Sequence, residues 1–274
     1  MWLRRHRHCP HHPITPLLRY SILCVAGLLV TSGCRAAVGT LTSRATDEWT
    51  RSYPLAANGE VQITNTNGRI EIEGVDESTV EVRAERTARA ATDALARELL
   101  PRIEISERAT PTLVQIETKR LSGIIIGATI EVQYHVRVPK SALVRVRTAD
   151  GLMAVESLRG RLVANTVNGS ISGRDLSGGV EARAVNGPVE IEVGAVGEDP
   201  IDLRTTNGTI QLRLPQSAKV NLSASCVNGV IDTSALTLDL MGEQSKRRVR
   251  GRMNGGGTPI ELNTVNGKIE VSAR

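Results

Sequence analysis

One dipeptide, Asn-Gly, recurs along this sequence inside a repeated frame of apolar residues. Within that frame the pair occurs seven times, once as Asp-Gly, at Asn67-Gly68, Asp150-Gly151, Asn168-Gly169, Asn186-Gly187, Asn207-Gly208, Asn228-Gly229 and Asn266-Gly267. Apolar or small residues lie two, four and six positions before each pair, and another apolar residue follows three positions after it. That alternation is the period of a β-strand with one buried face, and it continues on both sides of the turn.

The spacing of these pairs predicts how the strands are arranged. From Asp150 onward, successive pairs are 18, 18, 21, 21 and 38 residues apart. A period of about 20 residues is typical of stacked units, none of which can bury its apolar face alone. We therefore expect an all-β, single-domain parallel β-solenoid, β-helix-like, whose Asn side chains stack at one corner as a ladder. Independent hairpins are an alternative, because Asn-Gly also favours hairpin turns, and an exposed ligand-binding row of Asn is a third.

The N-terminal residues 1–33 have the order of a secretion signal. Arginines and no acids occupy residues 1–20, residues 21–30 are almost wholly apolar, and Thr-Ser-Gly precedes Cys34. The apolar run is too short to span a bilayer. The ending resembles a bacterial lipoprotein signal, which implies that Cys34 becomes the lipidated first residue of the mature protein. Ordinary cleavage and secretion, with Cys34 as a free thiol, is the alternative.

Composition divides the rest of the chain into two parts. Residues 34–57 are polar and are expected to form a flexible tether, and residues 58–274 form the repeat domain. Within the domain, Thr87 to Leu100 has helical spacing and is followed by Pro101, so one short helix is expected near its N-terminal side. Three further strands are expected over residues 103–105, 113–118 and 129–138.

Charge leaves one candidate binding surface. The chain has 34 basic and 29 acidic residues, and removing the four arginines of the signal leaves 30 against 29. Bulk charge therefore gives no support to nucleic-acid binding. One basic cluster remains, at Lys246, Arg247, Arg248, Arg250 and Arg252. It is interpreted either as a solvated loop inserted in one unit or as a site for anionic lipid headgroups or acidic glycan.

Residues that could carry chemistry are scarce. The His and Cys residues near the N-terminus lie in the charged leader, and His135, the one histidine beyond it, falls on an outward strand position. This argues against a His-dependent triad or a metal centre. Acidic pairs such as Glu71 and Glu73 are expected to be solubilising outward residues. Cys226 takes a small inward position and is expected to be a packed thiol. We expect no enzyme activity, no cofactor and no metal.

Two segments carry a family resemblance. The run YHVRVPKSALVRVRTADGLMAVESLRGRLVANTVNG and the ending GGGTPIELNTVNGKIEV resemble a bacterial family of adhesin-like β-strand-repeat domains of unknown function. The resemblance covers about residue 58 to the end. It implies a β-helix-like solenoid, often secreted, anchored or lipidated, with no established enzymatic activity and no agreed ligand. Because that family has no defined functional residues, it assigns a role to none here.

Together these features predict a bacterial cell-envelope lipoprotein whose rigid solenoid is a non-catalytic adhesion or interaction scaffold. Its expected partners are the membrane, through the lipid anchor, and a protein, glycan or anionic-lipid surface. The outer membrane or the periplasmic side is the favoured location. A polysaccharide-binding or polysaccharide-active β-helix protein is one alternative, and it would place Asp, Arg or Lys in a cleft on adjacent units. An envelope-stress sensing accessory protein is another, and it would require a cytoplasmic output region.

Overall fold

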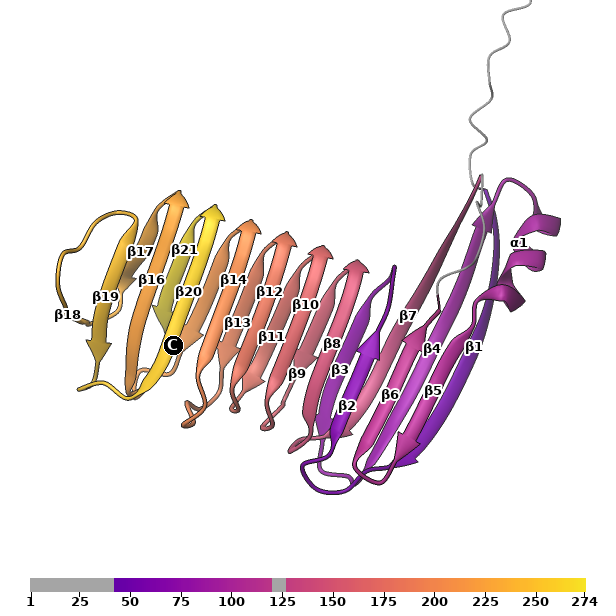
Figure 1. Ribbon diagram of the computed structural model, residues 1–274, viewed down its shortest axis with the longest axis horizontal. Helices are drawn as coiled ribbons and strands as arrows, with labels where there is room; N and C mark the ends of the chain where they lie inside the picture. Colours follow the sequence, from indigo (N-terminus) through magenta and orange to yellow (C-terminus); the bar gives the residue numbers. More distant parts are fainter. Residues whose placement is uncertain (1–41, 120–126) are drawn as a thin grey trace, which may run out of the picture. The chain divides into compact units, whose positions relative to one another are not determined.

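The computed structural model describes residues 42–119 and 127–274, which are mostly β and form two large, mostly parallel sheets (Figure 1). In spatial order, sheet A consists of β1 (Ser43–Pro54), β4 (Thr79–Ala90), β7 (Ala128–Pro139), β3 (Ile70–Val75), β9 (Met153–Glu156), β11 (Ile171–Leu176), β13 (Val189–Val193), β15 (Ile210–Leu214), β21 (Ile269–Ala273) and β17 (Ile231–Ala235). Sheet B consists of β18 (Asp239–Leu240), β19 (Arg248–Met253), β16 (Val220–Asn228), β20 (Thr258–Asn266), β14 (Ile201–Asn207), β12 (Val180–Asn186), β10 (Leu162–Asn168), β8 (Leu143–Asp150), β2 (Glu60–Thr64), β6 (Leu113–Thr118) and β5 (Ile105–Thr110).

The two arms of each repeat lie in different sheets. The strand before an Asn-Gly pair belongs to sheet B and the strand after it to sheet A, as β10 and β11 show. Each strand pairs in parallel with its equivalent in the neighbouring unit, so that Leu162 lies beside Val180 and Ile171 beside Val189. The hairpin alternative is therefore wrong, because the arms of a hairpin would pair with each other in antiparallel fashion.

The last repeat departs from sequence order. Strand β20 lies between β14 and β16, and β21 lies between β15 and β17, so the C-terminal unit is inserted into the array. The segment that accounts for the 38-residue spacing returns along β16 as antiparallel β19. In this order β20 and β21 each pair with a neighbouring strand on both edges, and β19 covers the outer edge of β16.

The first part of the domain is built from long antiparallel strands. β4 pairs with β1 on one edge and with β7 on the other. Strand β1 lies inside residues 34–57, so the tether expected there does not extend through Ser43–Pro54. The helix is also shorter than expected: α1 spans Asp93–Leu99, because residues through Ala90 pair on both edges of β4 and this outweighs the helical propensity of their alanines.

The core between the sheets is aliphatic. Equivalent inward residues from successive units stack in register; on sheet B they are Val144, Leu162, Val180, Ile201, Ile260 and Leu222, all at most 3% exposed. On sheet A the inward residues of β7, Val132, Tyr134, Val136 and Val138, are buried as well. Tyr134 is the largest fully buried side chain, and its hydroxyl lies 2.7 Å from the Thr118 hydroxyl. Thin layers of medium-sized side chains thus fill the interior.

Turn conformation accounts for only some glycines of the repeat: Gly68, Gly151, Gly187 and Gly267 have positive φ. Gly169 and Gly229 do not have positive φ. A Cβ added at Gly169 would lie 1.8 Å from the carbonyl oxygen of Gly151, and one at Gly229 would lie 1.8 Å from that of Gly267. Glycine is required at these two positions because the backbones of adjacent units touch there.

Candidate functional site

The basic cluster lies on a strand and the turn before it. Arg248, Arg250 and Arg252 project outward from β19, alternating with the buried or inward positions of Val249, Gly251 and Met253. Lys246 and Arg247 occupy the preceding turn. The interpretation as a solvated loop is therefore wrong for the three β19 arginines, because strand pairing fixes their direction. In register, these three lie opposite Ser225, Ser223 and Asn221 of β16.

Hydrogen bonds hold this end of sheet B in place. The Gln244 side chain accepts a hydrogen bond from the Arg250 backbone N–H at 3.0 Å and donates to the Arg250 carbonyl at 3.1 Å. Met241 N–H also donates to that carbonyl, at 2.9 Å. The backbone of the strand is thus partnered on its outer edge, and its arginine side chains remain available to solvent.

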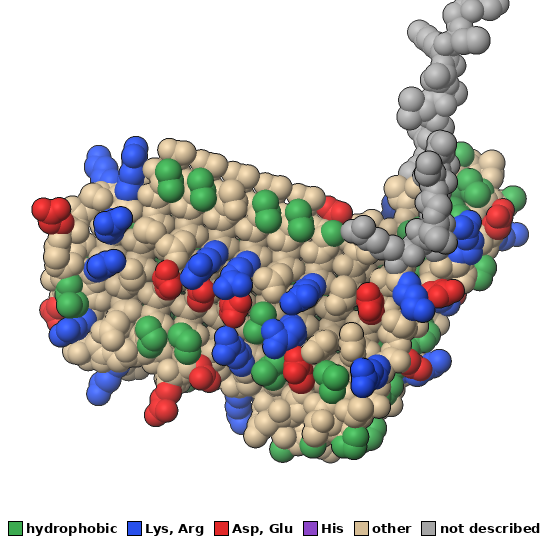
Figure 2. Space-filling model, in the orientation of Figure 1, with side chains coloured by type: hydrophobic (Ala, Val, Ile, Leu, Met, Phe, Trp, Pro, Cys, Tyr) green, Lys and Arg blue, Asp and Glu red, His purple; other side chains and the backbone are tan. Residues whose placement is uncertain are grey.

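Among the described residues, the cations of this cluster form no ion pairs with acids, although Asp239 lies opposite Arg252 in register. No ion pair in the described part of the chain involves Lys246, Arg247 or the three β19 arginines, whereas further along the same face Arg204 pairs with Asp202 at 2.7 Å. Figure 2 shows Lys and Arg side chains gathered at the end of the face where β16 and β19 lie. Five cations without acidic partners produce a local positive field in a chain of nearly balanced charge.

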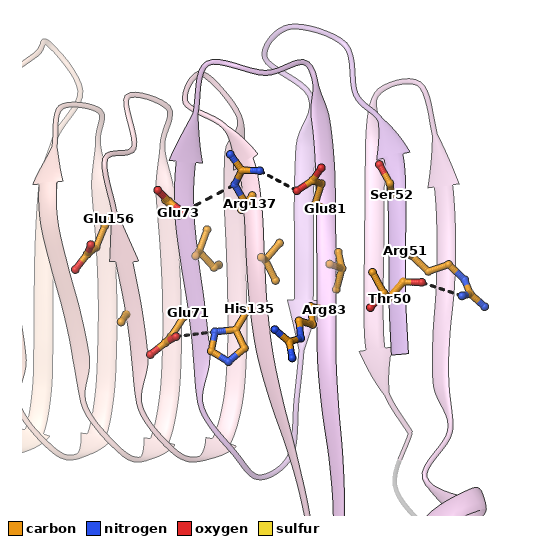
Figure 3. A pocket seen from close by; sticks show the side chains of 14 residues that line it. Thr50, Arg51, Ser52, Glu71, Glu73, Glu81, Arg83, His135, Arg137 and Glu156 are labelled. Carbon is orange, nitrogen blue, oxygen red and sulfur yellow. Dashed lines mark hydrogen bonds and ion pairs between the residues drawn. The ribbon is translucent and has the colours of Figure 1, made fainter. Parts of the chain in front are cut away.

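A groove on the outer face of sheet A is the second candidate. It has a volume of about 680 Å³ and lies over β1, β4, β7, β3 and β9 (Figure 3). His135 Nδ1 lies 2.7 Å from a Glu71 carboxylate oxygen. Arg137 contacts three carboxylates, those of Glu81 at 2.9 Å, Glu77 at 3.2 Å and Glu73 at 3.9 Å.

The groove offers hydrogen-bonding groups. The hydrogen bond that Arg137 donates to Glu81 and the negative charge of Glu77 raise the pKa of Arg137. Glu71 and Glu73, interpreted from the sequence as solubilising residues, in fact line this groove together with Glu156. Each of these carboxylates already has a basic neighbour: His135, Arg137 and Arg174, respectively. Such a surface can exchange hydrogen bonds with a polar ligand such as a glycan.

Sequence reasoning missed the groove because it depends on a crossover. Glu71 and Glu73 pair in register with His135 and Arg137, more than 60 residues later in the chain. The alternation of each strand was visible, but the pairing of β3 with β7 was not. Complementary charges at matching outward positions of the two strands were the available signal.

The repeated Asn side chains form a chain of hydrogen bonds. Each Nδ2 donates to the Oδ1 of the adjacent unit, from Asn228 through Asn266, Asn207, Asn186 and Asn168 to Asp150, at 2.7 to 2.9 Å. Backbone bonds run the opposite way, as from Gly169 N–H to the Asn186 carbonyl at 2.9 Å. Asn67 is outside this chain, because its amide donates to the Ile130 carbonyl at 2.8 Å. The Asn groups are thus engaged with one another.

Other predicted residues have the following places. Cys226 is 7% exposed, and burial raises the pKa of its thiol, which fits a packed side chain. Cys34 and the signal 1–33 lie outside the described residues. Within residues 42–119 and 127–274, no group of three or more His, Cys, Asp or Glu side chains is arranged to hold a metal ion. No helix in those same ranges has the length and apolar character needed to cross a membrane.

The family model Toastrack DUF4097 matches residues 56–272. The chain belongs to the Toastrack family. This family match agrees with the resemblance seen in the repeat segments and with two large, mostly parallel sheets. No curated protein matches the sequence significantly.

Three solved structures are matched at low sequence identity and low TM-score. A candidate cell adhesion protein from Clostridium sporogenes is 12% identical, with a TM-score of 0.46, and the match covers 84% of this chain and 100% of that one. A candidate adhesin from Bacteroides fragilis is 10% identical, with a TM-score of 0.27 over 83% and 97% of the two chains. A candidate lipid binding protein from Parabacteroides distasonis is 12% identical, with a TM-score of 0.29 over 82% and 96%.

Proposed function

We propose that this Toastrack protein is a cell-envelope lipoprotein whose β-strand array, a single β-solenoid, acts as a non-catalytic interaction scaffold. Three features support the proposal. The sequence before Cys34 resembles a lipoprotein signal, the array carries two broad outward faces, and hydrogen bonds between Asn side chains join adjacent units. A stiff surface of this kind binds partners that extend along several units.

The observation that carries the proposal is the unpaired basic surface on and before β19. Because no acid neutralises Arg247, Arg248 or Arg250, an anionic partner can approach them without displacing an existing ion pair. Phosphate groups suit guanidinium donors, which bind them in two-point geometry. The proposed partner is therefore an anionic surface of the envelope.

The test replaces Arg247, Arg248 and Arg250 together with Ser. Binding to anionic vesicles and to cells at low salt should fall at least tenfold, because three of the five cations are lost. The matched control replaces Arg83, Arg174 and Arg213, which lie on sheet A and are ion-paired, and removes the same charge. Equal losses in the two variants would show that net charge alone governs binding, and no loss in either would refute the proposed surface.

The anchor is tested separately at Cys34. Cys34→Ser should move the protein from the membrane fraction to the soluble fraction and abolish incorporation of labelled fatty acid. Wild-type protein without fatty-acid label would contradict lipidation, and the proposed scaffold would then act as a secreted protein.

A second function, polysaccharide binding, is favoured by the groove over β3 and β7. Its paired carboxylates and guanidinium groups match the hydroxyl pattern of a glycan. His135→Ala should weaken glycan binding severalfold and leave vesicle binding unchanged. The outward face of β13, where Glu190→Ala gives an equivalent surface change, is the control.

A further inference from the structure

A row of exposed valines runs along one border of sheet B, next to the Asn ladder. We call this border the turn rim and define it as residues 147–152, 165–170, 183–188, 204–209, 225–230 and 263–268. The residue before each ladder position is Val in four of the six units: Val167 is 46% exposed, Val185 43%, Val227 56% and Val265 40%. Figure 2 shows hydrophobic side chains in a line along this border.

Strand register makes the row straight. Asn168 pairs with Asn186, Asn186 with Asn207, Asn207 with Asn266 and Asn228 with Asn266, so the preceding residues are also aligned. Adjacent strands are about 4.8 Å apart, which gives a row of roughly 19 Å from β10 to β16. A hollow of about 750 Å³ lies between the valines and the next outward residues, including Arg183 and Arg204. An apolar line of this kind fits a flat, extended partner.

Charge on the turn rim is almost entirely positive. Its six segments contain the cations Arg147, Arg183, Arg204 and Lys268 and one acid, Asp150. The acids that pair with Arg183 and Arg204 on this face, Glu181, Asp202 and Glu261, lie one outward position further from the rim. Lys268 is paired with Asp232 and Glu270, which lie on strands of sheet A.

The basic cluster continues this pattern at one end of the row. Arg248 lies opposite Ser225, in the same outward row as Arg183 and Arg204. The Arg247 carbonyl accepts a hydrogen bond from Cys226 N–H, and the Lys246 carbonyl accepts one from Ile231 N–H, both at 3.0 Å. These bonds place both residues beside the end of the rim, so the valine row and the unpaired cations form one continuous surface.

We propose that the turn rim lies on an anionic lipid bilayer, with the valines among the headgroups and the basic side chains on lipid phosphates. The proposal deepens the proposed function, on which it rests for the attraction supplied by the β19 cations. A bilayer surface is flat over the length of the valine row, and its phosphates lie next to the acyl chains. Arginine and lysine side chains reach such phosphates while their aliphatic parts cover apolar surface.

The first test places a tryptophan reporter in the row. Val185→Trp and, as its control, Ser217→Trp are made in the mature chain, residues 34–274, carrying Cys34→Ser and Trp49→Phe. Neither an acyl chain nor the apolar signal then contributes to binding, and the introduced tryptophan is the one tryptophan of that chain. Ser217 is exposed in the connection between β15 and β16, at the opposite ends of the strands. With phosphatidylglycerol vesicles, fluorescence of the Val185→Trp protein should shift to the blue and be quenched by brominated lipid. The Ser217→Trp protein and vesicles of phosphatidylcholine alone should give neither change.

The second test removes the apolar row. Val185→Ser with Val265→Ser, which leaves the net charge unchanged, should lower affinity for phosphatidylglycerol vesicles at least tenfold with an unchanged melting temperature, because both positions are solvent-exposed in the free protein. Vesicle binding of the Val185→Trp protein without a spectral change would overturn the rim proposal and leave the β19 surface intact. Binding to soluble acidic polysaccharide but not to vesicles would also overturn it and assign the surface to a glycan. Binding to neither would refute both proposals.

Discussion

The hydrogen bonds of the Asn ladder all run in one direction, which predicts the position at which an Asp side chain is tolerated. Every Nδ2 donates toward Asp150, which accepts from Asn168 at 2.8 Å and donates to no ladder residue. An acidic residue therefore fits at that end, and the departure of Asp150 from the Asn repeat has a physical reason. Inside the ladder, Asn186 both donates to Asn168 at 2.9 Å and accepts from Asn207 at 2.8 Å.

Asn186→Asp should consequently destabilise the protein, and Asp150→Asn should not. In the Asn186→Asp variant, a carboxylate oxygen faces Asn168 Oδ1, so two acceptors meet without a proton between them. If the Asn168 amide turned over to donate to residue 186, its oxygen would instead face the Asp150 carboxylate. A hydrogen bond contributes a net stability of about 0.5 to 1.5 kcal/mol. Because these side chains are exposed to water, we expect Asn186→Asp to lower the free energy of unfolding by about 1 kcal/mol. For a domain of this size the melting temperature should fall by roughly 2 to 4 °C.

The penalty in the Asn186→Asp variant should depend on pH. When the introduced carboxyl is protonated it can donate to Asn168, so folding raises its pKa above the unfolded value of about 3.9. The stability it contributes is then present below that pH and is lost as pH rises through the folded pKa. Thermal unfolding of both variants at pH 3.5 and 7 tests this. Equal destabilisation by Asp150→Asn, or a penalty that grows on acidification, would refute the directional ladder.

Three further perturbations test the packing. Ile210→Asp buries a carboxylate in a fully buried position and should cost about 4 kcal/mol or more in chemical unfolding, whereas Arg213→Ser, on the outward face, should change stability by less than about 0.5 kcal/mol. Gly169→Ala places a methyl group 1.8 Å from a carbonyl oxygen of the next unit, and Gly197→Ala places one 3.1 Å from its nearest neighbour; the first should therefore lower the melting temperature more. Burial raises the pKa of Tyr134 to about 12, so the stability it contributes should fall as pH rises from about 10 to 12, and Tyr134→Phe should remove that part of the alkaline loss followed by circular dichroism.

The sequence was sufficient to predict the elements whose pattern is local. The inward and outward positions of the repeats follow from strand period, and the strand at Leu113–Thr118 has the predicted bounds. The Asn and Gly residues of the repeats lie at one border of sheet B, where close backbone approach, rather than turn conformation, explains Gly169.

Long-range pairing accounts for the features that the sequence did not predict. Insertion of β20 between β14 and β16 depends on which edges remain free once the other units are stacked, and no local pattern encodes that order. The strand β1 was missed because its polar outward residues, such as Arg44 and Glu48, dominate its composition, while pairing with β4 supplies its stability. The valine row became visible only when register aligned Val167, Val185, Val227 and Val265.

The central claim is that unpaired cations on and before β19 draw the protein to an anionic surface. The most direct measurement is vesicle affinity as a function of salt, for Cys34→Ser protein with and without Arg247, Arg248 and Arg250 replaced by Ser. Contacts between exposed charges are screened over about 8 Å at physiological salt. The account predicts a steep fall in affinity with salt for the intact cluster and a much shallower fall for the triple variant. Parallel salt dependences for the two proteins would contradict it.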